Sequence, residues 1–156
     1  MISFMLKSIL KTTLVAGVLD ISAAFVQAWF MSGVTPGQVL RYIASGAFGK
    51  AAHAGGLGMA AWGLFFHFLI AFVITACFFW IYPKWRLLGR HLWLDSLLIG
   101  LAAWVVTTRV VVPLSQIGAS SLHVRKALLA IGILVCCVGL PVALGAKRFY
   151  QTLNKK

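Results

Sequence analysis

Two residues of this chain, Asp20 and His67, combine acid–base chemistry with an unusual place in the sequence. Asp20 is one of only two acidic residues, and each of the pair lies near the middle of a long apolar run. A carboxylate in an apolar interior is costly unless it is paired, solvated or protonated. A carboxyl group beside an imidazole can share a hydrogen bond, pass a proton or hold a ligand.

Both runs are long enough to span a membrane as helices. Because the two expected spans run in opposite directions, Asp20 and His67 lie at similar depth. Each residue also lies on the face of its helix that carries small side chains, so we expect the two to approach each other, directly or through water. Three interpretations stay open. The pair could be a structural hydrogen bond that fixes helix register, or a proton relay or ligand site. Alternatively, Asp20 could meet a polar or basic group of another protein.

A second group of polar residues lies toward the outer ends of the expected helices: Arg41, His53, Arg109 and His123. Arg109 is interpreted first as a cation that reaches the lipid headgroups, and second as a partner for a lipid phosphate or a carboxylate. If these four residues cluster in space, an enzyme that acts on lipid at the outer interface is favoured.

The second acid, Asp95, is expected at the start of the third long helix, where a carboxylate is favourable to the helix dipole. It could also pair with Arg90 or Lys84. No cofactor or metal site is predicted. Neither zinc-ligand spacing nor a catalytic triad is present, and the three cysteines lie inside apolar runs as packing residues: Cys77, Cys136 and Cys137.

The composition indicates the kind of structure that holds these residues in place. The chain is 62% hydrophobic and 10% charged, with a mean hydropathy of +0.98, whereas an ordinary globular domain is about half apolar and about a quarter charged. Lys and Arg number 14 against 2 acids. Because these cations lie between apolar runs and form no stripe interleaved with aromatic residues, they indicate contacts with membrane lipids and exclude nucleic-acid binding.

Four apolar runs are long enough to span a bilayer as helices. The sequence therefore predicts an all-α integral membrane protein, a single four-transmembrane-helix bundle with spans at about 12–31, 57–82, 92–112 and 126–146. Pro83 and Pro113 follow the second and third runs. Between the first two spans, Thr35 and Pro36 predict the start of a short interfacial helix at about 36–48, because proline is favoured in the first helical turn.

Small and polar residues recur along one face of each predicted span, with the spacing i, i+4, i+7, i+11. These faces predict tight packing between helices and could also dock a partner chain. The stripes are Ala16, Asp20, Ala23 or Ala24 and Gln27; Gly56, Ala60, Gly63, His67 and Ala71; Ser96, Gly100, Ala103 and Thr107; Gly132, Cys136, Gly139 and Ala143.

Basic residues predict the orientation, since cytoplasmic loops are enriched in Lys and Arg. With four spans, nine of the 14 lie on the side of the termini and five on the other side. We therefore expect both termini in the cytoplasm, and the interfacial helix outside.

Several short runs resemble a family of small uncharacterised bacterial inner-membrane proteins of unknown function. They are residues 15–20 (VAGVLD), residues 42–46 (YIASG) with Phe48-Gly49, the stretch from Gly55-Gly56 to Phe66-His67, and residues 111–115 (VVPLS). The resemblance covers roughly residues 12 to 145. It implies a bacterial origin and four spans, and it carries no assigned activity.

The sequence favours a non-enzymatic role as an accessory or assembly subunit of a larger inner-membrane complex, because it offers little extramembrane surface and many small-residue faces. The expected partners are membrane lipids together with other membrane subunits or copies of the chain itself. The first alternative is a small carrier or channel for a solute, proton or lipid that uses Asp20 and His67. The second is the membrane enzyme at the outer interface.

Overall fold

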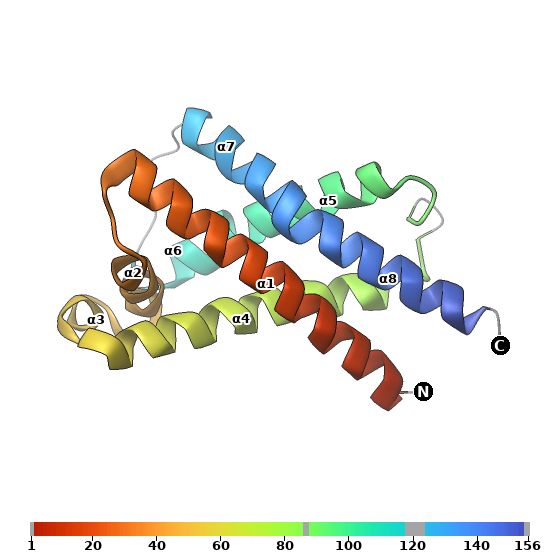
Figure 1. Cartoon of the computed structure of the whole chain (residues 1–156), viewed down its shortest axis with the longest axis horizontal. Helices are drawn as coiled ribbons and strands as arrows, with labels where there is room; N and C mark the ends of the chain where they lie inside the picture. The colour runs from red at the N-terminus through yellow and green to blue at the C-terminus, as the bar shows by residue number, and fades with distance from the viewer. Residues whose placement is uncertain (1, 86–87, 118–123, 155–156) are drawn as a thin grey trace.

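The computed structural model describes residues 2–85, 88–117 and 124–154, and in these ranges the chain is helical with short connections (Figure 1). Four helical stretches are each long and apolar enough to cross a membrane. Consecutive long helices run in opposite directions, so both termini lie at the same end of the bundle (Figure 1). The prediction of an all-helical chain with four long apolar helices is confirmed.

Two of the four long helices are continuous α-helices, and the other two contain a π-helical turn (η). The elements are α1 (Ile2–Ser32); the short helices α2 (Pro36–Phe48) and α3 (Ala51–Ala54); α4 (Gly56–Ile81); the third long helix, formed by α5 (Leu92–Val105), η1 (Val106–Val111) and α6 (Val112–Leu114); and the fourth, formed by α7 (Val124–Leu134), η2 (Val135–Gly139) and α8 (Leu140–Leu153).

The first and fourth helices extend beyond the apolar runs that predicted them. α1 begins at Ile2 and α8 ends at Leu153, whereas the predicted spans begin at 12 and end at 146. The added residues include lysines but no glycine or proline. Hydropathy marks the part of a helix that fits a bilayer, whereas the helix itself continues until a breaker or a cap ends it.

Each π-helical turn ends two residues before a proline. Val112 donates its backbone N–H to the carbonyl of Thr107, five residues earlier, and Pro113 follows it; the π-helical turn in the fourth helix lies before Pro141 in the same way. A proline ring inside an α-helix clashes with the carbonyl four residues back, and a wider turn relieves this crowding. The third helix therefore continues past Pro113 to Leu114, two residues beyond its predicted end.

Glycines on the predicted stripes allow the helices to approach closely. A Cβ atom on Gly139 would collide with the backbone carbonyl oxygen of Ser96. One on Gly100 would lie 2.7 Å from the backbone nitrogen of Val135. These contacts join the third and fourth long helices, so for these residues the small-residue face is used for packing inside the bundle.

The predicted stripe on the fourth helix is wrong in its first half. Gly139 and Ala143 are buried, but Gly132 and Cys136 are exposed. The prediction assumed 3.6 residues per turn throughout. The π-helical turn Val135–Gly139 inserts extra chain, which rotates the residues before it by roughly 100° for each residue added. Gly56 on α4 is also exposed, with nothing within 4 Å of a Cβ atom placed there.

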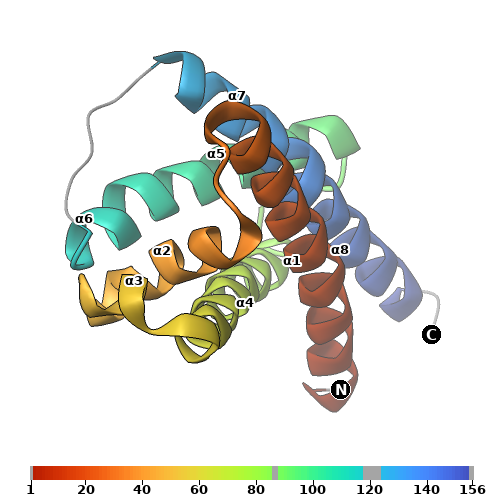
Figure 2. The ribbon, with the colours of Figure 1, turned by 60° about the vertical axis from the view of Figure 1, so that its left-hand side comes forward.

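The short helix α2 begins as predicted, with Pro36 in its first turn. Thr35 is its N-cap, and the Thr35 backbone N–H donates to the Gln38 side-chain oxygen at 2.8 Å. α2 then packs across α4 (Figure 2). A Cβ on Gly63 would collide with the carbonyl oxygen of Leu40. The sequence predicted a surface helix; its contact with α4 shows that it is also part of the helical bundle.

Aromatic residues close the bundle at the end that holds the termini. Phe79 and Phe149 are buried there, and the Tyr150 hydroxyl donates a hydrogen bond to the Phe79 carbonyl at 2.6 Å. Tyr82 stacks on Tyr150 with ring centroids 5.2 Å apart. This cluster joins the end of α4 to α8 and fills the interior of the bundle at the end that holds the termini.

Candidate functional site

A partly open cavity of about 450 Å³ lies between the helices of the bundle. Its walls come from all four long helices and from α2. Most of the residues that line it are apolar; the polar and charged ones are Asp20, Tyr42, His67, Thr107 and Ser115. A largely apolar cavity of this size with a few polar groups is typical of a small-molecule site.

Asp20 and His67 face each other in this cavity. The Nδ1 atom of His67 lies 4.0 Å from the Oδ2 atom of Asp20. Both side chains are largely buried, with exposed fractions of 11% for His67 and 22% for Asp20. The approach predicted from depth and helix face is therefore observed.

The other ring nitrogen of His67 determines the protonation pattern of the pair. Nε2 lies 2.9 Å from the backbone carbonyl oxygen of Gly17. A carbonyl only accepts hydrogen bonds, so Nε2 carries a proton and donates it. Nδ1 then faces Asp20, and a bare imidazole nitrogen and a carboxylate are both acceptors. Either one further proton lies on this pair, or a donor from a third molecule lies between the two groups.

The separation of 4.0 Å between Nδ1 and Oδ2 is too long for a direct hydrogen bond. It leaves both acceptor atoms accessible to a group that donates hydrogen bonds to each of them. Asp20 and His67 therefore form no direct hydrogen bond, and a water molecule or a ligand has room to bridge them.

Glycine at position 17 allows α1 and α4 to meet beside the pair. A Cβ on Gly17 would lie 2.5 Å from the ring of Phe68, so a larger residue there would require the Phe68 ring to move. The Phe68 ring in turn makes an edge-on contact with His67, with centroids 5.4 Å apart. The imidazole is thus held by one hydrogen bond and one aromatic neighbour, which fixes the direction of Nδ1.

The two π-helical turns border the same cavity. Thr107 and Val111 of η1 line it, as does Val138 of η2. Turns of this kind are rare and are often found at functional sites, since they change the direction of side chains and loosen backbone pairing. Their presence on two facing helices gives this wall an irregular backbone that a regular α-helical bundle would lack.

Tyr42 and Ser115 line the cavity although neither was predicted as a site residue. The missed signal for Tyr42 is the spacing of Val39, Tyr42, Ile43 and Gly46, which follows one helical face and lines the cavity. Ser115 could not have been found in this way, since it comes from a distant part of the chain.

A pair of hydrogen bonds brings Ser115 to the site. The Gln116 backbone N–H donates to the Gly46 carbonyl at 2.9 Å. The Gln116 side-chain amide donates to the Ala47 carbonyl at 2.6 Å. These contacts join the end of the third long helix to α2, and the two segments lie close together in Figure 2.

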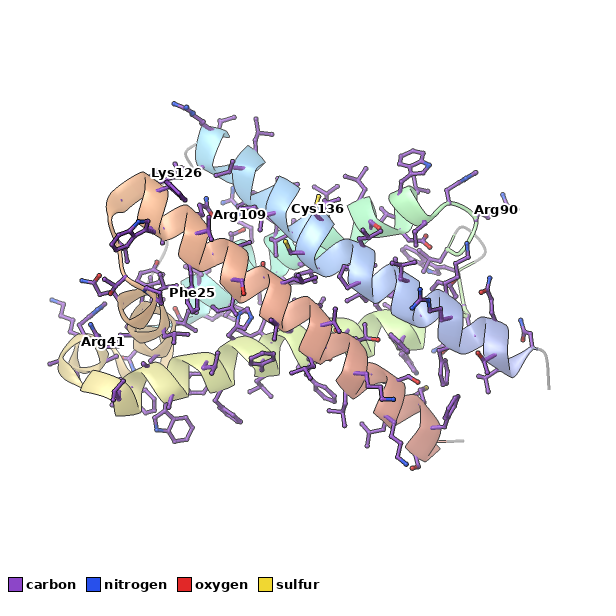
Figure 3. All side chains as sticks on the ribbon, viewed as in Figure 1. Phe25, Arg41, Arg90, Arg109, Lys126 and Cys136 are labelled. Carbon is purple, nitrogen blue, oxygen red and sulfur yellow. The ribbon has the colours of Figure 1, made fainter. Side chains whose placement is uncertain are left out.

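The described members of the expected outer group lie on three different elements. Arg41 lies on α2, His53 on α3 and Arg109 on η1, and Arg41 and Arg109 are well separated (Figure 3). His123 lies outside the described residues. Arg109 is exposed, as expected for a cation that reaches out of the bundle.

Asp95 has a structural position outside the cavity. It is fully buried in the first turn of α5, and its Oδ2 atom accepts a hydrogen bond from the Gly89 backbone N–H at 2.9 Å. In the ranges that the structure describes, neither Arg90 nor Lys84 forms an ion pair with it. Asp95 therefore orders the preceding turn and the start of the helix, which makes it a matched control for Asp20.

No family model, curated protein or solved structure matches this chain. Its class is defined by its own fold and site. It is an all-helical chain with four candidate membrane-spanning helices and a partly open cavity between them that contains a carboxyl–imidazole pair. Within residues 2–85, 88–117 and 124–154, no cluster of three or more potential metal ligands is present.

Proposed function

We propose that the chain is a multi-pass protein of the bacterial cytoplasmic membrane with both termini in the cytoplasm. The four long apolar helices support membrane insertion. The excess of Lys and Arg on the side of the termini supports the orientation. The bacterial origin depends on the family resemblance of the sequence.

Its function in this proposal is that of a small carrier that binds a molecule in the central cavity. The observation that carries it is the cavity of about 450 Å³ in which Asp20 and His67 face each other without a direct hydrogen bond. The ligand has a mostly apolar body, to match the walls. It also has one group that donates hydrogen bonds or carries a positive charge, to satisfy the Asp20 carboxylate and His67 Nδ1.

The test is to identify molecules that stay bound to the purified protein. The wild-type protein, extracted in mild detergent, is expected to retain a small molecule that mass spectrometry detects after denaturation. Asp20→Asn is expected to lose it, because the amide removes the negative charge while keeping the size of the side chain. Asp95→Asn is the matched control, since it changes the only other acid, outside the cavity. Equal retention in wild type and Asp20→Asn would contradict the proposal.

A specific observation also favours the accessory-subunit role as a second candidate. Gly132 is exposed, with no neighbour within 4 Å of a Cβ placed there, and no residue of α7 is buried. An exposed small residue on an apolar helix allows another helix to approach closely. Under this second proposal, α7 docks onto a further membrane subunit.

Gly132→Leu separates the two proposals. In an accessory subunit, it would release a stoichiometric partner that co-purifies with the wild type in native mass spectrometry. Gly58→Leu is the control, because Gly58 is another exposed glycine with open space around it, on α4. If the wild type purifies alone and carries a ligand, the accessory role is rejected and the carrier role is supported.

A further inference from the structure

A second hollow, of about 320 Å³, lies on the outside of the bundle between α1 and the fourth long helix. These helices lie side by side in both ribbon views (Figures 1 and 2). The groove has a basic end and an apolar length, and its main lining residues are Lys11, Val15 and Leu19 from α1, and Cys136, Leu140 and Arg148 from η2 and α8.

The lining residues are spaced so that the groove is continuous. Lys11, Val15 and Leu19 are four residues apart and share one face of α1. At 1.5 Å per residue, the groove extends along α1 for about 12 Å from the level of Lys11 to that of Leu19. On the facing helix, Leu140, Leu144 and Arg148 follow the same spacing in the opposite direction, so both cations lie at the same end.

The two cations have no side-chain carboxylate of the chain to neutralise them. The only acidic residues are Asp20 and Asp95. Asp20 faces His67 in the central cavity, and Asp95 is buried against Gly89. With a formal net charge of +12, the protein must find its counter-charges in other molecules.

We propose that this groove binds one anionic phospholipid, with its phosphate between Lys11 and Arg148 and an acyl chain along Val15, Leu19 and Leu140. The ammonium and guanidinium groups match a phosphate in charge and in hydrogen bonding. The apolar walls match a hydrocarbon chain over the depth at which lipid surrounds a spanning helix. Neither the match to the phosphate nor the match to the acyl chain involves the central cavity, so this proposal does not depend on the proposed carrier function.

The experiment measures lipid binding to the intact, delipidated protein by native mass spectrometry. Phosphatidylglycerol is expected to add to the wild type at one molecule per chain at a concentration where phosphatidylcholine does not. The double variant Lys11→Gln/Arg148→Gln is expected to weaken this binding by roughly tenfold or more, since it removes two charge-assisted contacts. Arg125→Gln/Lys126→Gln, which removes two cations at the opposite end, is expected to bind like the wild type.

A second pair of variants tests the groove without changing any charge. Val15→Trp fills the apolar length and is expected to block the lipid, whereas Val73→Trp does not. The two valines have similar exposed fractions, 53% and 51%, and Val73 lies on α4 away from the groove. Undiminished binding to Val15→Trp, equal binding of phosphatidylcholine, or displacement of the lipid by inorganic phosphate alone would each overturn the proposal.

Discussion

His67 bridges α1 and α4: its Nε2 atom is 2.9 Å from the Gly17 carbonyl oxygen, and its Nδ1 atom is 4.0 Å from the Asp20 carboxyl group. One side chain thus contacts two residues that are three positions apart on the neighbouring helix. The first contact fixes the position of the imidazole. The second brings it to the only acid in the cavity.

Replacing His67 alone should therefore lower the free energy of unfolding more than replacing both His67 and Asp20. In His67→Leu the Asp20 carboxyl group loses its neighbour, and we expect the free energy of unfolding to fall by about 1–3 kcal/mol. In Asp20→Leu/His67→Leu no polar group is left unsatisfied there, so most of this loss should be recovered. The measurement is reversible unfolding in mixed micelles, analysed as a double-mutant cycle. Strictly additive effects would mean that the two residues do not interact.

The packing of α2 on α4 requires a glycine at position 63. A Cβ there would collide with the Leu40 carbonyl oxygen, so Gly63→Ala should destabilise the protein by about 1–3 kcal/mol, as overpacking does elsewhere. It should also weaken binding in the cavity, because α2 forms one of the walls.

Gly58→Ala is the matched control on the same helix, because nothing lies within 4 Å of its Cβ position. Alanine is favoured over glycine in a helix by roughly 0.5–1 kcal/mol, so this variant should be neutral or slightly more stable. If Gly63→Ala behaves like Gly58→Ala in the same unfolding measurement, α2 does not pack on α4 in the way described.

Tyr82, directly after the end of α4, links stability to alkaline pH. Burial, and to a smaller extent the negative charge of Asp95, raise the pKa of Tyr82 above its usual value of 10.0. The folded state therefore keeps the phenol proton at a pH where the unfolded chain has begun to lose it. This contribution to stability is complete below about pH 10 and is lost as the pH rises through the folded-state pKa.

The corresponding measurement is the melting temperature as a function of pH. From about pH 9 upward, Tyr82→Phe should lose less stability than the wild type, because phenylalanine has no proton to release. Asp95→Asn should retain most of the wild-type pH dependence that Tyr82 contributes, since burial is the larger cause of the raised pKa. Identical curves for wild type and Tyr82→Phe would exclude this contribution.

Some features of the fold could be predicted because each depends on local sequence or on depth alone. The apolar runs predict the long helices, and Thr35 with Pro36 predicts the start of α2. Asp20 and His67 could be brought together because both lie near the middle of long apolar runs, on small-residue faces of neighbouring helices. None of these inferences depends on how a helix departs from ideal geometry.

The features that could not be predicted depend on such departures and on distant contacts. The π-helical turn before Pro141 changes the face that α7 presents, and a regular period cannot reveal it. Ser115 reaches the cavity through hydrogen bonds from Gln116 to the end of α2, 69 residues away along the chain. The wall formed by α2 depends on the glycine at position 63, because the side chain of any other residue there would collide with α2.

The fourth long helix allows a direct test of whether a regular period describes its packing. That period places Gly132 and Gly139 on one face, and it predicts that replacing either glycine by alanine changes the free energy of unfolding equally. In the structure, a Cβ at Gly139 would collide with the Ser96 carbonyl, whereas Gly132 has open space. Gly139→Ala should therefore lower the free energy of unfolding by about 1–3 kcal/mol, and Gly132→Ala should leave it unchanged or slightly raised. Equal losses in the two variants would mean that the fourth helix has no π-helical turn and packs with one continuous face. Unequal losses would mean that the exposed residues of α7 are available to lipid or to a partner, while those of α8 hold the bundle together.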